Sequence, residues 1–399
     1  MARAFLIDAA RTPFGRYRGG LSGVRVDDLA ALPVTELLRR HGTGGSGRLD
    51  PEHVEDVVYG NTNGAGEENR DVARMVALLA GLPESVPGVT VNRLCASGGE
   101  SLVQAARTVR AGDAELLIAG GVEGMSRAPF VMPRAERALP DKQELVSTAL
   151  GWRLVNPRMD PVWTVPLGRA AERIAVELGI TRTEMDAYAL RSHRRAASAW
   201  DAGVHEGFVF PVTTPEGVTV RRDESVRIET DEARLARLAS AFSPDGPVTA
   251  GNSAPLNDGA LAALVGSQDR AERLGSAVLG EFLGSATVAV EPHRFPLAPV
   301  NAIRRLLVRL GARATDVDLW EINEAFAALV LSVLHHLPEV ERDSVNVHGG
   351  ALAYGHPLGA SMPRTVVDLC RHLHHRGGGL GIAAAGVGVG QGVAIAVRV

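Results

Sequence analysis

Residues 89–112 read VTVNRLCASGGESLVQAARTVRAG, an alternating apolar run followed by a helical pattern, with Cys95 at the junction. The apolar stretch AELLIAGGVEGMS (114–126) comes next. A second copy of this arrangement runs from SVNVHGGALAYGHPLGAS (344–361) through MPRTVVDLCRHLHHRGG to GLGIAAAGVGVGQG (379–392). Alternating β and α segments predict sheets covered by helices, and two copies predict a pseudo-twofold α/β body.

The composition bounds the class of protein. The chain has 399 residues, 45% of them hydrophobic and 22% charged, with a formal net charge of −4. This charge predicts neither a nucleic-acid partner nor an anionic membrane partner. Two cysteines cannot build a disulfide framework, and we expect a cytoplasmic protein. The apolar C-terminal stretch is long enough for a membrane span, but its glycines and Gln391 divide it into two predicted strands.

The repeat suggests a division of the chain. We expect a first half at residues 1–120, completed by residues 250–275, and a second half at residues 276–399. Residues 121–249 hold most of the proline, tryptophan and charge, which predicts an inserted, partly helical lid domain. The stretch 250–275 reads as a helix that returns to the first half.

Three residues could carry chemistry. A thiol at a helix N-terminus, such as Cys95, has a lowered pKa, although a lone cysteine can equally be a small buried hydrophobe. The flanking glycines permit close backbone approach and favour the nucleophile. His356 lies in a Gly/Pro-rich loop equivalent to that of Cys95, which predicts a Cys–His pair for acyl transfer, with a structural loop histidine as the alternative. Asn323, at a strand end, could orient a water or a carbonyl.

Five ordered motifs carry a family resemblance. NRLCASGG (92–99), GGVEGMSRAPF (120–130), AGNSAPLNDGA (250–260), NEAF (323–326) and GGALAYGHPLGAS (349–361) closely resemble those of the thiolases. The resemblance implies the five-layered αβαβα thiolase fold, an inserted loop domain that binds coenzyme A, and a homodimer or homotetramer. It implies a CoA thioester as substrate, with no cofactor and no metal.

The resemblance also implies residue roles. Cys95 is similar to the nucleophile, His356 to the residue that activates it, and Asn323 to the holder of an oxyanion-hole water. Backbone N–H groups of Cys95 and Gly388 resemble a second oxyanion hole, where one donor is worth roughly 3–4 kcal/mol. The other implied substrate contacts are Ala254, Phe326, Leu167 and Phe295, and the basic candidates for coenzyme A are Arg221 and Arg222.

The chain departs from the family pattern at one catalytic position. Thiolases carry a second cysteine in a CxGGGxG stretch, and aligning GVGVGQG on Gln391 places Gly386 there. Cys370 lies on an apolar helical face and is expected to be core. His348 replaces the usual asparagine before the glycine pair, as a relocated base or as neutral drift. If only this acid/base is missing, a cysteine at position 386 is expected to raise conventional thiolysis; no gain would mean that the pocket has diverged further or that His348 blocks it.

The chain also departs from the family pattern at residues that contact the thioester substrate. Ala254 stands where a pantetheine-contacting serine is usual, and Pro255 where glycine is usual. A specialised enzyme fed by CoA or by an acyl carrier protein would fit. Three functions stay open: a Claisen-type acyltransferase that uses His348 or decarboxylation, an acyltransferase to an amine, alcohol or water, and a non-catalytic subunit.

Overall fold

The computed structural model describes residues 2–42, 49–275 and 278–399. Each half of the chain contributes a mixed β-sheet. The N-terminal sheet has the order β1-β10-β5-β3-β4, with bounds β1 Phe5–Arg11, β3 Asp56–Gly60, β4 Gly88–Val91, β5 Leu116–Gly124 and β10 Asn257–Gly266. The C-terminal sheet has the order β11-β14-β13-β12, with bounds β11 Gly280–Ala289, β12 Leu319–Ile322, β13 Leu380–Val387 and β14 Gln391–Arg398.

The two sheets repeat one topology. β3 and β5 pair in parallel, as do β12 and β13, while β10 and β14 each run antiparallel to those neighbours. β1 and β11 add the next antiparallel strand in each half. The halves join where Phe5 pairs with Glu281 and Leu6 with Gly280. The predicted duplication is confirmed by this correspondence.

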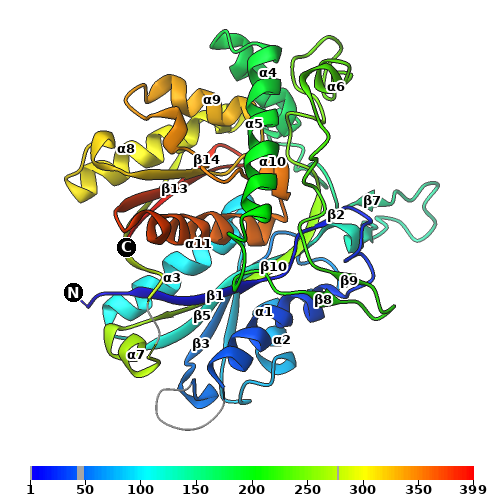
Figure 1. Cartoon of the computed structure of the whole chain (residues 1–399). Helices are drawn as coiled ribbons and strands as arrows, with labels where there is room; N and C mark the ends of the chain where they lie inside the picture. Colours follow the sequence, from blue (N-terminus) through cyan, green and yellow to red (C-terminus); the bar gives the residue numbers. More distant parts are fainter. Residues whose placement is uncertain (1, 43–48, 276–277) are drawn as a thin grey trace.

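Helices complete five layers (Figure 1). α3 and α11 lie between the sheets, α1 and α2 cover the outer face of the N-terminal sheet, and α8 and α9 cover the outer face of the C-terminal sheet. The bounds are α1 Val26–His41, α2 Val72–Leu79, α3 Ser97–Ala111, α8 Ala298–Leu310, α9 Ala327–His336, α10 Ala351–Tyr354 and α11 Leu358–Arg376. The predicted αβαβα fold is confirmed.

The strand residues alternate between the layers. In β10, Leu261 and Ala263 face the central helices, whereas Ala262 and Leu264 face α1 and α2. Both faces of the strand are therefore apolar, as expected for a sheet that helices cover on both sides.

The segment between β5 and β10 lies outside the two large sheets. It holds the two-stranded pairs β6–β7 and β8–β9 and three α-helices. Their bounds are β6 Phe130–Val131, β7 Val146–Ser147, α4 Leu167–Glu177, α5 Arg182–Asp201, β8 Val212–Thr213, β9 Thr219–Val220 and α6 Glu232–Ala236. β5 continues to Gly124, so the chain leaves the N-terminal sheet after that residue.

Two expectations for the ends of the repeats have different outcomes. The stretch 250–275 is not a helix, because it forms the fully buried strand β10 followed by the short α7 (Gln268–Arg273). The C-terminal stretch forms the two strands β13 and β14, as predicted. Among the described residues, no helix has the length and apolar character needed to cross a bilayer.

Candidate active site

Cys95 is held in a short 3₁₀ turn, Leu94–Ala96, directly before α3. The residue before it, Leu94, has a φ of 47°, a left-handed conformation that is uncommon for a leucine. Thr62 Oγ1 and Ser97 Oγ both donate to the Leu94 carbonyl, at 3.2 and 2.6 Å. Such backbone persists only where surrounding contacts impose it, and these hydroxyls supply contacts of that kind.

The glycines after Cys95 allow α3 to start against α11. A Cβ on Gly98 would lie 2.2 Å from the Gly359 carbonyl oxygen, in the first turn of α11. The turn that carries Cys95 packs on α11 and β13. The glycines thus serve close backbone approach, as predicted, and bring the two halves together at the thiol.

The thiol of Cys95 is buried, and its pKa is shifted in the direction opposite to the expected one. Burial raises the pKa of Cys95 to about 11, while the backbone N–H groups of Gly388 and Cys95 act in the opposite direction. The expectation of a lowered pKa is therefore wrong, because the cost of burying a thiolate exceeds what these donors return. The sulfur accepts a hydrogen bond from the backbone N–H of Gly388, one of the two donors that the resemblance assigns to an oxyanion hole.

His356 is fixed through its backbone and one ring nitrogen. Its N–H donates to Asn257 Oδ1 at 2.9 Å, and its Nδ1 lies 2.6 Å from Ser361 Oγ. Ser361 Oγ donates its single hydrogen to the Pro357 carbonyl at 2.9 Å, so it accepts from a protonated Nδ1. Nε2 is left as a bare, buried acceptor with no partner among the described residues.

The imidazole of His356 is neutral at physiological pH. Burial lowers its pKa to about 4, with a smaller effect of Arg364 in the same direction. A neutral ring with a free Nε2 can accept the proton of a thiol. Asn257 and Ser361, which sequence reasoning did not single out, lie within two of the quoted motifs.

Asn323 follows β12 at the same end of the sheet. Its backbone N–H donates to Ala384 on β13 at 2.8 Å. Its side chain is fully buried, and neither amide atom has a hydrogen-bond partner in the part of the chain that the structure describes. A buried amide without protein partners is suited to holding a water or a substrate oxygen.

Gly386, where the resemblance calls for a second thiol, faces an apolar surface. A Cβ there would lie 2.7 Å from Leu329 Cδ1 and 3.1 Å from the carbonyl oxygen of Phe295. The rings of Phe295 and Phe326 are 6.3 Å apart and pack edge to face. Leu167 packs against the same apolar cluster. No acid or base therefore takes the place of the missing side chain among these neighbours.

His348 lies away from this end of the sheet. Its ring packs on His372, with centroids 4.3 Å apart, and burial lowers the pKa of His348 to about 4. His372 is fourteen residues past Leu358, the first residue of α11 after His356. At 1.5 Å per residue, that is about 21 Å along the helix. The structure therefore does not bring His348 to Cys95.

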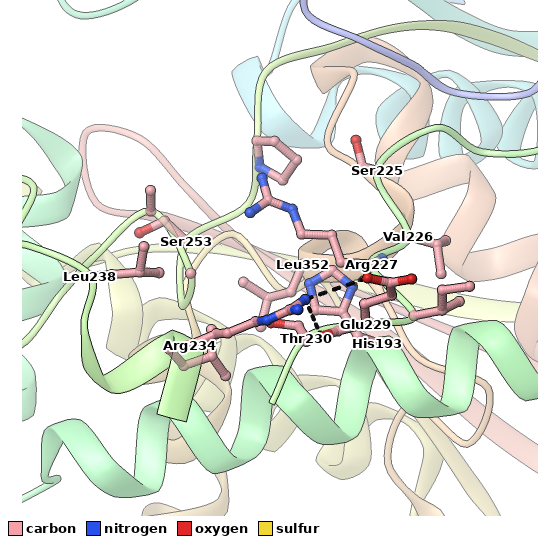
Figure 2. A pocket seen from close by; sticks show the side chains of 15 residues that line it. His193, Ser225, Val226, Arg227, Glu229, Thr230, Arg234, Leu238, Ser253 and Leu352 are labelled. Atoms are coloured by element: carbon pink, nitrogen blue, oxygen red, sulfur yellow. Dashed lines mark hydrogen bonds and ion pairs between the residues drawn. The ribbon is translucent and has the colours of Figure 1, made fainter. Parts of the chain in front are cut away.

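A cavity of about 500 Å³ lies between the inserted segment, residues 250–255 and Leu352 of α10 (Figure 2). Arg227, Arg234 and His193 line it, whereas Arg221 and Arg222 do not. Arg222 instead pairs with Asp201 at 3.4 Å. The two arginines that do line it were missed because nothing in the loop sequence marks which charges turn inward.

The wall of this cavity includes residues of the AGNSAPLNDGA motif and of α10. It includes Ser253, Pro255 and Leu352, and Leu352 belongs to α10, four residues before His356. Ala254, the expected contact, is not part of the wall. The Ser253 hydroxyl is buried and has no partner among the described residues, so it offers a hydrogen bond one position earlier.

Among the residues that the structure describes, no group of three or more His, Cys, Asp or Glu side chains is placed to hold a metal ion. Cys370 is fully buried in the central hydrophobic layer, as expected for a core residue. Both cysteines are unbridged.

The comparisons with known proteins agree with this geometry. Residues 4–269 match the family description "Thiolase, N-terminal domain" and residues 276–399 match "Thiolase, C-terminal domain". A relative from Escherichia coli named beta-ketoadipyl-CoA thiolase is 46% identical over 385 residues, 95% of this chain and 94% of that protein. A Pseudomonas putida protein of the same name is 44% identical over 95% of this chain and 94% of its own length.

Solved structures give the same result. Human mitochondrial 3-ketoacyl-CoA thiolase superimposes with a TM-score of 0.92 at 33% identity, covering 100% of this chain and 98% of that one. Bacillus anthracis acetyl-CoA acetyltransferase superimposes with a TM-score of 0.92 at 34% identity, covering 100% and 99%. The chain therefore belongs to the thiolase family, a family of acyltransferase enzymes.

Proposed function

We propose that this protein takes an acyl group from a CoA thioester onto Cys95 and transfers it to a second substrate. The observation that carries the proposal is the buried thiol at the Gly388 N–H, in a turn packed on the helix that follows His356. The unpartnered Nε2 of His356 and amide of Asn323 support it, because a catalytic group needs free hydrogen-bonding capacity.

Loading proceeds by exchange of one thioester for another. The Cys95 proton passes to His356 Nε2 as Sγ attacks the thioester carbonyl. The tetrahedral oxyanion collapses, the C–S bond to CoA breaks, and the CoA thiolate takes the proton back from His356. One acyl-Cys95 and one free CoA result. With a thiol pKa of about 11, this proton transfer must accompany attack.

The second step needs a carbanion that the chain does not generate by deprotonation. Position 386 has no side chain and faces Leu329 and Phe295. Absence of a general acid/base costs about 10²–10⁴-fold. We therefore infer a β-carboxyacyl thioester as second substrate. Its C–CO₂ bond breaks, the electron pair attacks the acyl-Cys95 carbonyl, and CO₂ leaves. The Cys95 sulfur departs as a thiolate and takes a proton from solvent, because His356 returned its own to CoA during loading.

The missing side chain at position 386 is also compatible with a second class of acceptor. An amine, an alcohol or water needs a base at its own nucleophilic atom, which His356 supplies, and no acid/base at position 386. The products then are an amide, an ester or a free acid instead of a β-ketoacyl thioester. Product analysis separates the two classes.

The side chains that line the cavity beside Arg227 and Arg234 favour the CoA moiety as its ligand. A phosphorylated nucleotide fits two guanidinium groups, and the Ser253 hydroxyl is available to a pantetheine amide. An acyl carrier protein would present the same pantetheine arm. We propose the CoA thioester as substrate without a resident cofactor, in a homodimer or homotetramer of the cytoplasm. β4 supports the dimer, since it ends the N-terminal sheet with a free edge in the described residues.

Intact-protein mass spectrometry after mixing with a panel of acyl-CoAs tests the loading step. We expect an acyl adduct on the wild-type chain that is absent from Cys95→Ala. Adding a β-carboxyacyl-CoA should then release CO₂ and a β-ketoacyl thioester. An adduct without CO₂ release would favour the amine, alcohol or water acceptor. No adduct with any acyl-CoA or acyl carrier protein would instead indicate a non-catalytic subunit.

A further inference from the structure

Two adjoining cavities lie beside β11, where α3 and α8 flank it, and nothing in the acyl-transfer chemistry uses them. Their volumes are about 270 and about 700 Å³, and both are lined by Arg107 and Arg110 of α3. The smaller one also includes Arg309 of α8. They share no lining residue with the cavity beside Arg227.

The three guanidinium groups converge on one short piece of β11. Arg107 Nη2 donates to Ser285 Oγ at 3.3 Å, and Arg309 Nη1 donates to the Ser285 carbonyl at 2.7 Å. Arg110 Nη1 donates to the Leu283 carbonyl at 3.2 Å. A guanidinium has five N–H donors, so these bonds orient each group and leave most of its donors free.

These positive charges are not balanced by carboxylates in the described structure. None of Arg107, Arg110 and Arg309 forms an ion pair among the described residues. Glu281, on the same strand, is within electrostatic reach of Arg110, but Arg3 already holds it through hydrogen bonds of 2.8 and 2.6 Å. Like charges gathered at one cavity favour an anion that would pair with them.

The smaller cavity also has an apolar wall. Phe282 and Leu306 are almost fully buried, and Leu283 and Leu310 are half-buried beside them. A ligand of inorganic-ion size would leave this wall unused. A short hydrocarbon attached to the anionic group would cover it.

We propose that these cavities form a second ligand site, for a small molecule with a carboxylate or phosphate group and a short apolar chain. The oxyanion lies at Arg107, Arg110 and Arg309, because a guanidinium can donate two parallel hydrogen bonds to two oxygens of either group. The chain lies along Phe282, Leu306 and Leu310. The site is separate from acyl transfer and does not depend on which acceptor that reaction uses.

Isothermal titration calorimetry on the full chain tests this site with four probes: hexanoate, hexyl phosphate, inorganic phosphate and hexanol. We expect one of the two anionic amphiphiles to bind with 1:1 stoichiometry, at least tenfold tighter than either inorganic phosphate or hexanol. The tighter of hexanoate and hexyl phosphate identifies the head group. Saturating CoA should leave the affinity unchanged, because the two sites share no residue.

Arg309→Gln and Arg107→Gln should each weaken the binding at least tenfold. Arg305→Gln is the matched control, since Arg305 is an exposed arginine of the same helix that contacts the Thr287 carbonyl and lines neither cavity. Circular dichroism verifies that each variant is folded. The proposal is wrong if no probe binds, if CoA displaces the probe, or if Arg309→Gln and Arg305→Gln bind it equally well.

Discussion

Ser361 Oγ lies 2.6 Å from His356 Nδ1 and donates its own hydrogen bond to the Pro357 carbonyl. It therefore accepts from Nδ1, which carries the ring proton, and Nε2 is the nitrogen without a proton. This single hydroxyl keeps Nε2 unprotonated on the buried side of the ring. The base is thus oriented by a residue in the first turn of α11, the helix that follows it, five positions along the chain.

Replacing Ser361 with alanine should slow acylation of Cys95. The change leaves a buried Nδ1–H without an acceptor, at a cost of about 1–3 kcal/mol, or about 5–150-fold in rate. The rate of adduct formation by quenched-flow mass spectrometry measures this. Ser332→Ala is the control, because Ser332 is equally buried and donates to the Ala328 carbonyl inside α9. Equal rates for both variants would remove Ser361 from its positioning role.

The pH dependence of acylation should reflect a thiol–imidazole pair. The pKa of His356 is lowered to about 4, so the ring is neutral above that pH and acylation is lost only as the pH falls through about 4. The pKa of Cys95 is raised to about 11, so alkylation by iodoacetamide without substrate should accelerate with pH up to that range. Intact-mass measurements from about pH 3 to about pH 11 follow both, because this range spans the two pKa values. A flat alkylation profile above pH 7 would mean a thiolate–imidazolium pair instead.

Restoring a thiol at position 386 should require a second change. Gly386→Cys alone places Cβ 2.7 Å from Leu329 Cδ1, which should destabilise the fold by about 1–3 kcal/mol and give no gain in thiolysis. Together with Leu329→Ala it should raise thiolysis of a β-ketoacyl-CoA by about 10²–10⁴-fold. Loss of the absorbance of the β-ketoacyl-CoA enolate measures the rate. Leu329→Ala alone is the control and should show no rise.

His348→Asn should leave acylation and turnover within twofold of the wild type. The ring packs on His372, about 21 Å along α11 from the active-site end, so it can neither take nor give a proton there. His356→Asn, tested beside it, should abolish acylation. A large loss of turnover in His348→Asn, with unchanged thermal unfolding, would restore the relocated-base hypothesis.

Arg234→Ala should raise the KM for an acyl-CoA by about fivefold with little change in kcat, as expected for an exposed contact of about 1 kcal/mol. Arg222→Ala is the matched control, since Arg222 pairs with Asp201 outside the cavity. Steady-state kinetics at two salt concentrations separate the variants. If Arg222→Ala raises KM more than Arg234→Ala does, the cavity in Figure 2 is not where the CoA moiety lies.

Local patterns were sufficient for most of the fold. The repeat, the turn at Cys95 and the two C-terminal strands follow from apolar periodicity and glycine placement, which act over a few residues. The stretch that became β10 did not, because its alanines and leucines favour a helix and only burial between two helix layers makes it a strand.

The site was harder to predict where it depends on packing. The pKa of Cys95 depends on how deeply α11 covers the turn, and the direction of His348 depends on where His372 lies. Neither quantity is encoded within a motif. Arg227 and Arg234 likewise owe their place at the cavity to the path of the inserted segment, which no periodicity describes.

Cys95 comes from the first half of the chain, whereas His356, Asn323 and Gly388 come from the second. These residues form one site only while α3 and α11 pack against each other. Activity is therefore an assay for the docking of the two halves. Mild denaturants should abolish acylation before they remove the helical signal, and neither half expressed alone can acylate its own residues in this way.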